Sequence, residues 1–145
     1  MIKAVTSDVS ATRYRRCYFL MAVGAPLRIL AVDNDPSVTL SMRFLFDGPR
    51  YEITTMDSGL AALSQLDGNP DQYDVIIVDE RMPNLTGVEL VNAIRKRGIT
   101  GKVIVVSAHL SREIRAAYQR IGVQVMLSKP FNIDSLRLAV DLCAA

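Results

Sequence analysis

Chemically reactive side chains stand at the ends of four apolar runs in this sequence. They are Asp33, Asn34 and Asp35 after the first run, Asp79 and Glu80 after another, Ser107 after the next, and Ser128 and Lys129 after the last. Two carboxylates brought together repel each other, so they require a cation. Mg²⁺ prefers oxygen ligands and commonly takes one or two protein carboxylates, which leaves positions for phosphate oxygens. A carboxylate beside Mg²⁺ and a lysine can attack a phosphoryl group, because the cations offset the charge on both reactants.

These groups meet only if the apolar runs are parallel strands. From Leu27 onward an apolar run and an amphipathic run alternate five times, and the expected strands are Leu27–Val32, Tyr51–Met56, Asp74–Val78, Lys102–Val106 and Val123–Leu127. Strands that are apolar on both faces are typical of a parallel sheet covered by helices on each side. The alternation predicts an α/β fold with a doubly wound five-stranded sheet in the order 2-1-3-4-5 and five helices.

Capping residues and apolar spacing predict the five helices. The first begins at Asp35-Pro36, an N-cap followed by proline, and the second is capped by Ser58. The third covers about Gly87–Arg97. Residues expected on the buried helix faces are Val38, Met42 and Leu45; Leu60, Leu63 and Leu66; Leu90, Val91 and Ile94; Ile114, Ala117, Tyr118 and Ile121; and Leu136, Ala139, Val140 and Cys143. Ligands of open α/β sheets bind at the carboxyl ends of the strands, so we expect the reactive side chains to converge there.

Composition limits the class of protein. The 145 residues are 50% hydrophobic and 22% charged, which indicates one ordinary globular domain, and the net charge of +2 is too small to indicate a nucleic-acid surface. The basic excess lies in residues 1–26, which we expect to be an N-terminal extension with Met21 as an alternative start. The apolar stretch Tyr18–Val23 is far shorter than the ~20 residues of a membrane helix. Cys17 and Cys143 form no ligand spacing, so we expect a cytoplasmic protein with two incidental thiols.

Four motifs follow one another in order, each at the end of an expected strand. They are Ile29-Leu30-Ala31-Val32-Asp33-Asn34-Asp35-Pro36, Tyr73-Asp74-Val75-Ile76-Ile77-Val78-Asp79 with Met82-Pro83 and Gly87, Val105-Val106-Ser107-Ala108, and Ser128-Lys129-Pro130-Phe131. On these motifs, residues 27–145 resemble the receiver domain of bacterial two-component response regulators, of the chemotaxis-regulator type with a flavodoxin-like fold. The chain stops soon after the fifth helix, so we expect a single-domain receiver without an output domain.

The resemblance implies a role for each matching residue. Asp79 would be the phosphoacceptor, taking a phosphoryl group from a phosphohistidine on a sensor histidine kinase or a histidine phosphotransfer protein. Asp33, Asp79 and the backbone carbonyl of Arg81 would hold Mg²⁺. Ser107 would bond a phosphoryl oxygen and report the modification. Lys129 would neutralise the acyl phosphate, with the following peptide bond to proline in the cis form.

The resemblance also implies how such a protein signals. It would be no enzyme beyond its own phosphorylation and slow dephosphorylation. A separate target protein would dock on the face formed by the fourth helix, the fifth strand and the fifth helix. We expect no direct contact with nucleic acid or membrane, and a homodimer stays open.

Two positions depart from the family pattern. The family usually has two adjacent acids after the first strand, and Asn34 stands in the second place. Its amide oxygen is a further candidate ligand without charge, so we expect weaker Mg²⁺ binding. Asp35 is expected to cap the helix rather than bind metal. Met126 occupies a position where the family commonly has a reorienting Tyr or Phe, so it either switches less discretely or only fills the core.

Six further polar residues allow a functional or a solvated role. His109 and Arg81 could modulate hydrolysis of the acyl phosphate from the rim of the pocket, or could simply face water. Glu80 and the cluster Arg95-Lys96-Arg97 are expected to be solvated surface, and positive charge at a helix C-terminus suits the helix dipole.

Three alternative functions remain in view. The first is a degenerate receiver that no longer accepts phosphate, suggested by Asn34 and Met126. The second is a haloacid-dehalogenase-type phosphatase, whose Asp-x-Asp would be Asp33-Asn34-Asp35, but no acidic pair follows Lys129 and Asp79 would be unexplained. The third is a flavodoxin-like cofactor protein, but the acidic first loop would repel a phosphate.

Overall fold

Ten helices and strands alternate along the part of the chain that the structure describes. The computed structural model describes residues 24–144, so the expectations about Cys17, Met21 and the stretch Tyr18–Val23 concern residues outside it. The elements are β1 (Leu27–Val32), α2 (Pro36–Leu45), β2 (Tyr51–Met56), α3 (Gly59–Asp67), β3 (Val75–Val78), α4 (Gly87–Lys96), β4 (Lys102–Ser107), α5 (Arg112–Arg120), β5 (Val125–Ser128) and α6 (Ile133–Ala144).

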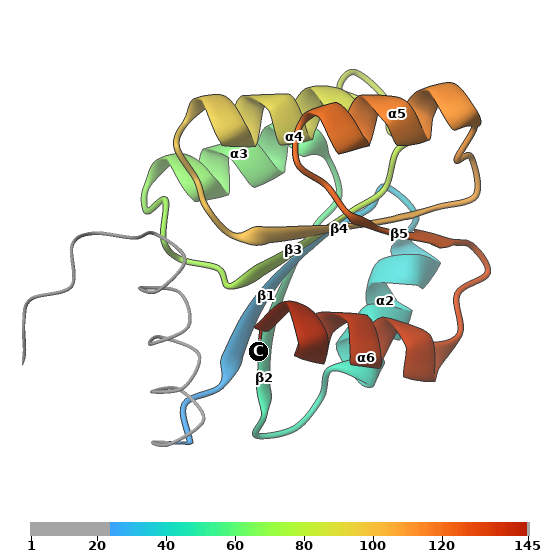
Figure 1. The fold of residues 1–145 in the computed structure, drawn as a ribbon. Helices are drawn as coiled ribbons and strands as arrows, with labels where there is room; N and C mark the ends of the chain where they lie inside the picture. The colour runs from blue at the N-terminus through green and yellow to red at the C-terminus, as the bar shows by residue number, and fades with distance from the viewer. Residues whose placement is uncertain (1–23, 145) are drawn as a thin grey trace, which may run out of the picture.

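The five strands form one parallel sheet in the order β2-β1-β3-β4-β5. Helices α2 and α6 cover one face, and α3, α4 and α5 cover the other (Figure 1). The predicted fold class, strand order and five helices are therefore confirmed for the described residues. The order reverses direction between β1 and β3, so the carboxyl ends of these two strands flank the crevice where ligands of such sheets bind.

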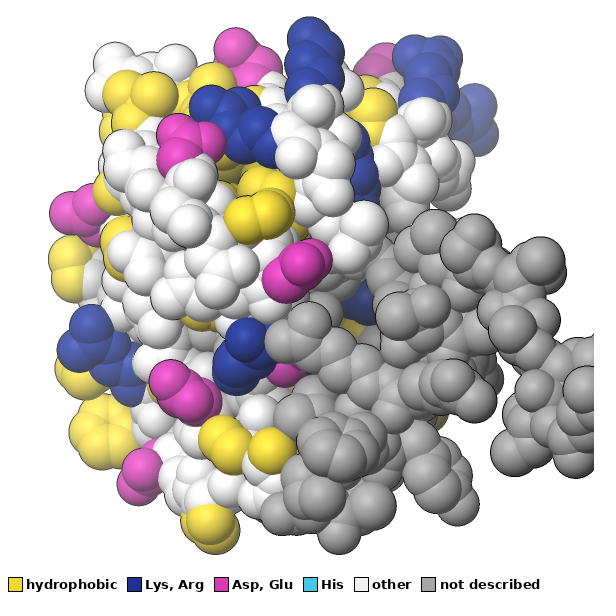
Figure 2. Space-filling model, turned by 90° about the vertical axis from the view of Figure 1, so that its left-hand side faces the viewer, with side chains coloured by type: hydrophobic (Ala, Val, Ile, Leu, Met, Phe, Trp, Pro, Cys, Tyr) yellow, Lys and Arg dark blue, Asp and Glu magenta, His cyan; other side chains and the backbone are white. Residues whose placement is uncertain are grey.

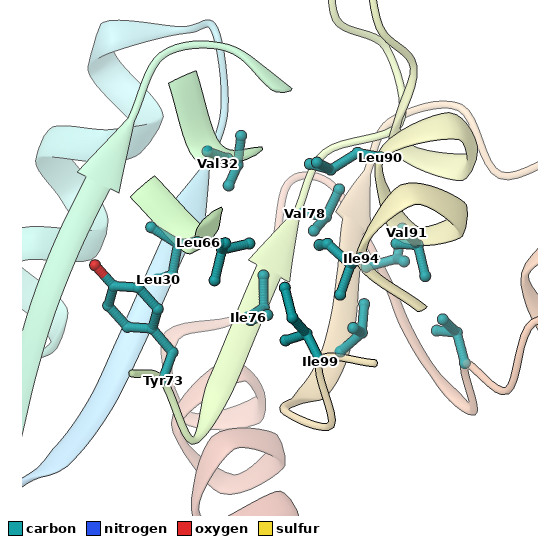
Figure 3. Close-up of a cluster of buried hydrophobic side chains, with 14 of the residues drawn as sticks. Leu30, Val32, Leu66, Tyr73, Ile76, Val78, Leu90, Val91, Ile94 and Ile99 are labelled. Atoms are coloured by element: carbon teal, nitrogen blue, oxygen red, sulfur yellow. The ribbon is translucent and has the colours of Figure 1, made fainter. Parts of the chain in front are cut away.

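Alternate residues of the central strands pack into two separate hydrophobic cores, one on each face of the sheet. Leu30, Val32, Ile76 and Val78 join the core beneath α3, α4 and α5, which Figure 3 shows in close-up. Their neighbours Ile29, Ala31, Val75 and Ile77 join the core beneath α2 and α6. All eight side chains are buried, as expected for strands covered on both faces.

Side-chain caps start the helices where the sequence predicts. The carboxylate of Asp35 accepts hydrogen bonds from the backbone N–H and the hydroxyl of Ser37, at 2.9 and 2.7 Å, and Pro36 opens α2. The hydroxyl of Ser58 accepts from the N–H of Ala61 at the start of α3. One residue of this expected face is wrong: Leu60 is 58% exposed, whereas Leu66 is buried and Leu63 packs against the core.

Four strand boundaries differ slightly from the prediction. The third strand begins at Val75, although the backbone N–H of Asp74 still donates to the carbonyl of Arg28 at 2.9 Å. The fourth strand extends to Ser107. The fifth begins at Val125, because the N–H of Val123 bonds back to the carbonyl of Tyr118 and completes the turn after α5, and it ends one residue later than predicted, at Ser128.

Charged side chains of both signs are interspersed with apolar ones on the face shown in Figure 2, where no field of a single sign gathers among the described residues. Within residues 24–144, no helix combines the length and the apolar character needed to cross a membrane.

Candidate functional site

Three charged side chains from three different strand ends meet at the carboxyl edge of the sheet. The Nζ of Lys129 lies 2.6 Å from Oδ2 of Asp33 and 3.5 Å from Oδ1 of Asp79. Both acids are buried, with 2% and 6% of their surface exposed. The structure brings the two acids and Lys129 together in one pocket, as the expected strand order predicts.

Backbone hydrogen bonds that continue the sheet hold these residues in place. The N–H of Asp79 donates to the carbonyl of Val32 at 3.0 Å, which ties the end of β3 to the end of β1. The N–H of Lys129 donates to the carbonyl of Ser107, also at 3.0 Å, and so extends the pairing of β4 with β5. The pocket is thus built on rigid strands. The Lys129–Pro130 peptide bond is cis, in agreement with the resemblance.

Burial dominates the electrostatics of Asp79. Removal from water raises the pKa of the Asp79 carboxyl, and the nearby charge of Asp33 raises it further. Lys129 and a side-chain hydrogen bond from Ser107 oppose this rise without cancelling it. One ammonium therefore leaves the pair of acids incompletely neutralised, and the pocket favours a further cation.

Ser107 ends β4 inside the pocket and is completely buried. Its hydroxyl accepts a hydrogen bond from the backbone N–H of His109 at 3.2 Å. Residue 109 itself is exposed, so its imidazole is not enclosed in the pocket. Arg81, two residues after Asp79, is also exposed.

The oxygen donors of the pocket suit Mg²⁺ in kind but are few. Asp33 and Asp79 supply carboxylates, and hard oxygen ligands are what Mg²⁺ prefers. Asn34 is exposed beside them, while the carboxylate of Asp35 is engaged at the start of α2. Among the described residues, no three acids, histidines or cysteines are grouped so that they could hold a metal. The donor set therefore fits an ion that keeps several waters.

Met126 lies on β5, where its backbone pairs with Val105. Its side chain is partly buried and packs against the core beneath α3, α4 and α5. This placement is compatible with a filling role, and a thioether cannot donate a hydrogen bond to the pocket.

The interpretation of Glu80 as solvated surface is wrong. Only 7% of this residue is exposed, and its Oε1 accepts hydrogen bonds from the N–H of Val88 at 3.0 Å and the hydroxyl of Tyr118 at 3.2 Å. Burial raises the pKa of the Glu80 carboxyl, and these two hydrogen bonds oppose the rise. A charged residue after a strand carries no sequence signal for burial, since its partners come from other elements.

The prediction that the cluster Arg95-Lys96-Arg97 is solvated surface is also incomplete. The guanidinium of Arg95 is partly buried and donates to the carbonyls of Ile99 and Gly101, both at 3.0 Å. Arg97 forms an ion pair of 2.7 Å with Asp67 on α3. Two of the three side chains therefore fasten the end of α4 to neighbouring segments.

Comparison with protein families gives a match to the response regulator receiver domain over residues 29–141, which contain the whole pocket. The chain belongs to this family. The receiver is a signalling domain of two-component systems, and the match spans every strand and the pocket residues from Asp33 to Lys129.

Individual relatives agree with the family match. The transcriptional regulatory protein GlrR of Escherichia coli K12 is 34% identical over 118 residues, which are 80% of this chain and 26% of GlrR. The response regulator MprA of Mycobacterium sp. strain KMS is 32% identical over 111 residues, which are 77% of this chain and 47% of MprA. The chain thus spans less than half the length of these curated relatives.

Solved structures support the fold. The chemotaxis protein CheY4 of Vibrio cholerae superposes with a TM-score of 0.75 at 28% identity, covering 82% of this chain and 99% of that protein. A CheX–CheY–BeF₃–Mg complex from Borrelia burgdorferi gives a TM-score of 0.80 at 19% identity, covering 86% and 94%. At that identity the second likeness concerns the fold alone.

Proposed function

We propose that this chain is a phosphoacceptor receiver, in which Asp79 takes a phosphoryl group from a phosphohistidine. The donor would be a sensor histidine kinase or a histidine phosphotransfer protein. The observation that carries this proposal is the position of Asp79, which is buried at the end of β3 with its Oδ1 3.5 Å from the Nζ of Lys129.

The transfer follows from the groups in the pocket. A carboxylate oxygen of Asp79 forms a bond to phosphorus while the bond from phosphorus to the donor imidazole nitrogen breaks. The electron pair of that bond stays on the imidazole, which takes up a proton. Lys129 stabilises the charge that accumulates on the phosphoryl oxygens, and the hydroxyl of Ser107 donates a hydrogen bond to one of them.

Asp33 and Asp79, with the backbone carbonyl of Arg81 and the amide oxygen of Asn34, would hold Mg²⁺. When bound, this cation neutralises charge shared between carboxylate and phosphoryl oxygens. Asn34 supplies no charge where an acid would, so we expect weaker Mg²⁺ binding than at a site with a second acid in that place.

Signalling would proceed by contact with another protein. We propose that the modified receiver, residues 27–145, presents the face of α5, β5 and α6 to a separate target in the cytoplasm, with residues 1–26 as an extension. A second copy of the chain is the alternative occupant. His109 and Arg81 are exposed and follow Ser107 and Asp79 by two residues, and we propose that they influence hydrolysis of the acyl phosphate.

Intact mass measures the proposed modification directly. The purified chain is incubated with acetyl phosphate and Mg²⁺, and one HPO₃ group adds about 80 Da. We expect one adduct in the unaltered chain and in Asp47→Asn, which changes an exposed acid away from the strand ends, and none in Asp79→Asn. An adduct that survives in Asp79→Asn would contradict the assignment of Asp79.

A degenerate receiver is the second candidate, because the described residues offer no group of three acids for a metal and Asn34 stands beside Asp33. It would act through protein contacts alone. No adduct in the unaltered chain, even with Mg²⁺ raised to high concentration, would favour it over the phosphoacceptor.

A further inference from the structure

Glu80 joins three elements in a buried junction directly beside the phosphoacceptor. Its backbone carbonyl accepts from the N–H of Gly87 at 2.9 Å, and its side-chain Oε1 accepts from the N–H of Val88 at 3.0 Å, both in the first turn of α4. The same Oε1 accepts from the hydroxyl of Tyr118 on α5 at 3.2 Å. Tyr118 is completely buried.

The junction leaves no space for a side chain at Gly87, which packs against the backbone of Asp79. A Cβ added at Gly87 would lie 2.5 Å from the carbonyl oxygen of Asp79 and 2.9 Å from Cα of Glu80, and would clash with the hydroxyl of Tyr118. The Tyr118 hydroxyl therefore lies against the same short stretch of main chain that carries the phosphoacceptor. In such close packing, a shift of one group displaces its neighbours.

The hydrogen bonds of Glu80 are unevenly distributed. Oε1 accepts both donors, whereas the buried Oε2 has no hydrogen-bond partner among the described residues. The hydroxyl of Tyr118 and the first turn of α4 therefore share one acceptor oxygen, so a displacement of the Glu80 carboxylate acts on both.

We propose that the hydrogen bond between Tyr118 and Glu80 couples the state of Asp79 to the position of α5, with Tyr118 as a positioning residue. This inference rests on the proposed function. A phosphoryl group on Asp79 draws Lys129 and Ser107 toward itself and shifts the peptide between Asp79 and Glu80. Glu80 transmits that shift through its carboxylate to the hydroxyl of Tyr118, and so to α5, which borders the proposed docking face.

Amide hydrogen exchange of α5 tests the coupling. Beryllium fluoride with Mg²⁺ is the probe for a loaded Asp79, and exchange is compared with and without it in the unaltered chain, Tyr118→Phe and Tyr73→Phe. The last is a matched control, because Tyr73 is also buried (Figure 3) and its hydroxyl accepts from the side chain of Gln65, at the opposite end of β3.

Loading should change the exchange rates of Arg112–Arg120 by about threefold or more in the unaltered chain and in Tyr73→Phe. In Tyr118→Phe the change should fall to less than half of that value, although the probe still binds. An unchanged response of α5 in Tyr118→Phe, or no response in the loaded unaltered chain, would overturn the coupling. Failure of the unaltered chain to bind the probe or form the acetyl phosphate adduct would instead refute the proposed function.

Substitutions of Glu80 test the same hydrogen bond from the side of the acceptor. Glu80→Gln keeps an oxygen that accepts from Val88 and Tyr118, so the response of α5 should persist. Glu80→Leu removes the acceptor and should abolish the response. If Glu80→Gln loses the response while Tyr118→Phe keeps it, the charge of Glu80 is responsible and the role of Tyr118 is refuted.

Discussion

Asp79 and Glu80 are adjacent in the chain, equally buried, and placed in two very different environments. Asp79 points into the pocket at the sheet edge, where its partners are the charges of Lys129 and Asp33. Glu80 points into the helix layer, where its partners are an amide N–H and a hydroxyl. Alternation along an extended chain sends successive side chains to opposite sides. The contrast teaches that burial alone does not mark a reactive acid, since the charge of its partners decides what it can do.

The largest effect should come from removing the ammonium group of Lys129. Lys129→Ala should slow labelling of Asp79 by acetyl phosphate by about 10²-fold, because the ammonium stabilises charge that develops during transfer. Intact mass followed over time gives the rate. Lys102→Ala, an exposed lysine at the opposite end of β4, is the control and should label normally. Equal rates in both variants would contradict the role of Lys129.

Crowding the junction should cost the most stability. Gly87→Ala places a methyl group against Tyr118, Asp79 and Glu80, and overpacking of this kind costs about 1–3 kcal/mol. Urea unfolding measures the loss. Gly68→Ala is a suitable control, since a Cβ there meets nothing within 4 Å. A destabilisation no larger than that of the control would show that the junction is looser than described.

Removing each acid in turn should change stability in opposite directions. Glu80→Ala leaves the buried hydroxyl of Tyr118 and the N–H of Val88 without an acceptor, which should cost about 1–3 kcal/mol. Asp79→Asn relieves repulsion with Asp33 and should raise the unfolding free energy at neutral pH by up to about 1 kcal/mol. Chemical unfolding without Mg²⁺ compares them. Two losses of similar size would remove the distinction between the two acids.

The smallest effect concerns alkaline pH. Burial, with Glu80 and Asp79 facing it, raises the pKa of Tyr118, so the folded chain keeps the phenolic proton where the unfolded chain releases it. The stability contributed by this residue is complete below the unfolded pKa of about 10 and declines above it, by about 1.4 kcal/mol per pH unit. Tyr118→Phe should therefore lose stability less steeply above pH 10 in urea titrations. Parallel curves for both chains would contradict this.

The sequence predicts the scaffold and the pocket for a simple physical reason. An unbroken apolar run such as Val75–Val78 can only be a strand covered on both faces, and parallel strands bring their carboxyl ends to one edge. The proximity of Asp33, Asp79, Ser107 and Lys129 can therefore be predicted from the sequence. Predictions that rest on such local patterns agree with the structure, as the Asp35 cap of α2 also does.

The junction could not be predicted, because its contacts depend on tertiary packing. Glu80 follows β3 and Tyr118 lies on α5, 38 positions later in the chain, so nothing local links them. A polar residue after a strand resembles any solvated turn residue. The prediction that Leu60 is buried is wrong for a related reason, since spacing alone does not define how much of a short helix meets the sheet.

The wide separation of Asp33 and Lys129, 96 positions apart yet 2.6 Å from each other, has a consequence for protein synthesis. A ribosome that has completed β3 has already made Asp79, but the amine that assists it is not yet translated. Nascent, truncated or partly unfolded chains would therefore be poor substrates for the donor. Under the proposed function, only finished and correctly folded copies could carry the signal.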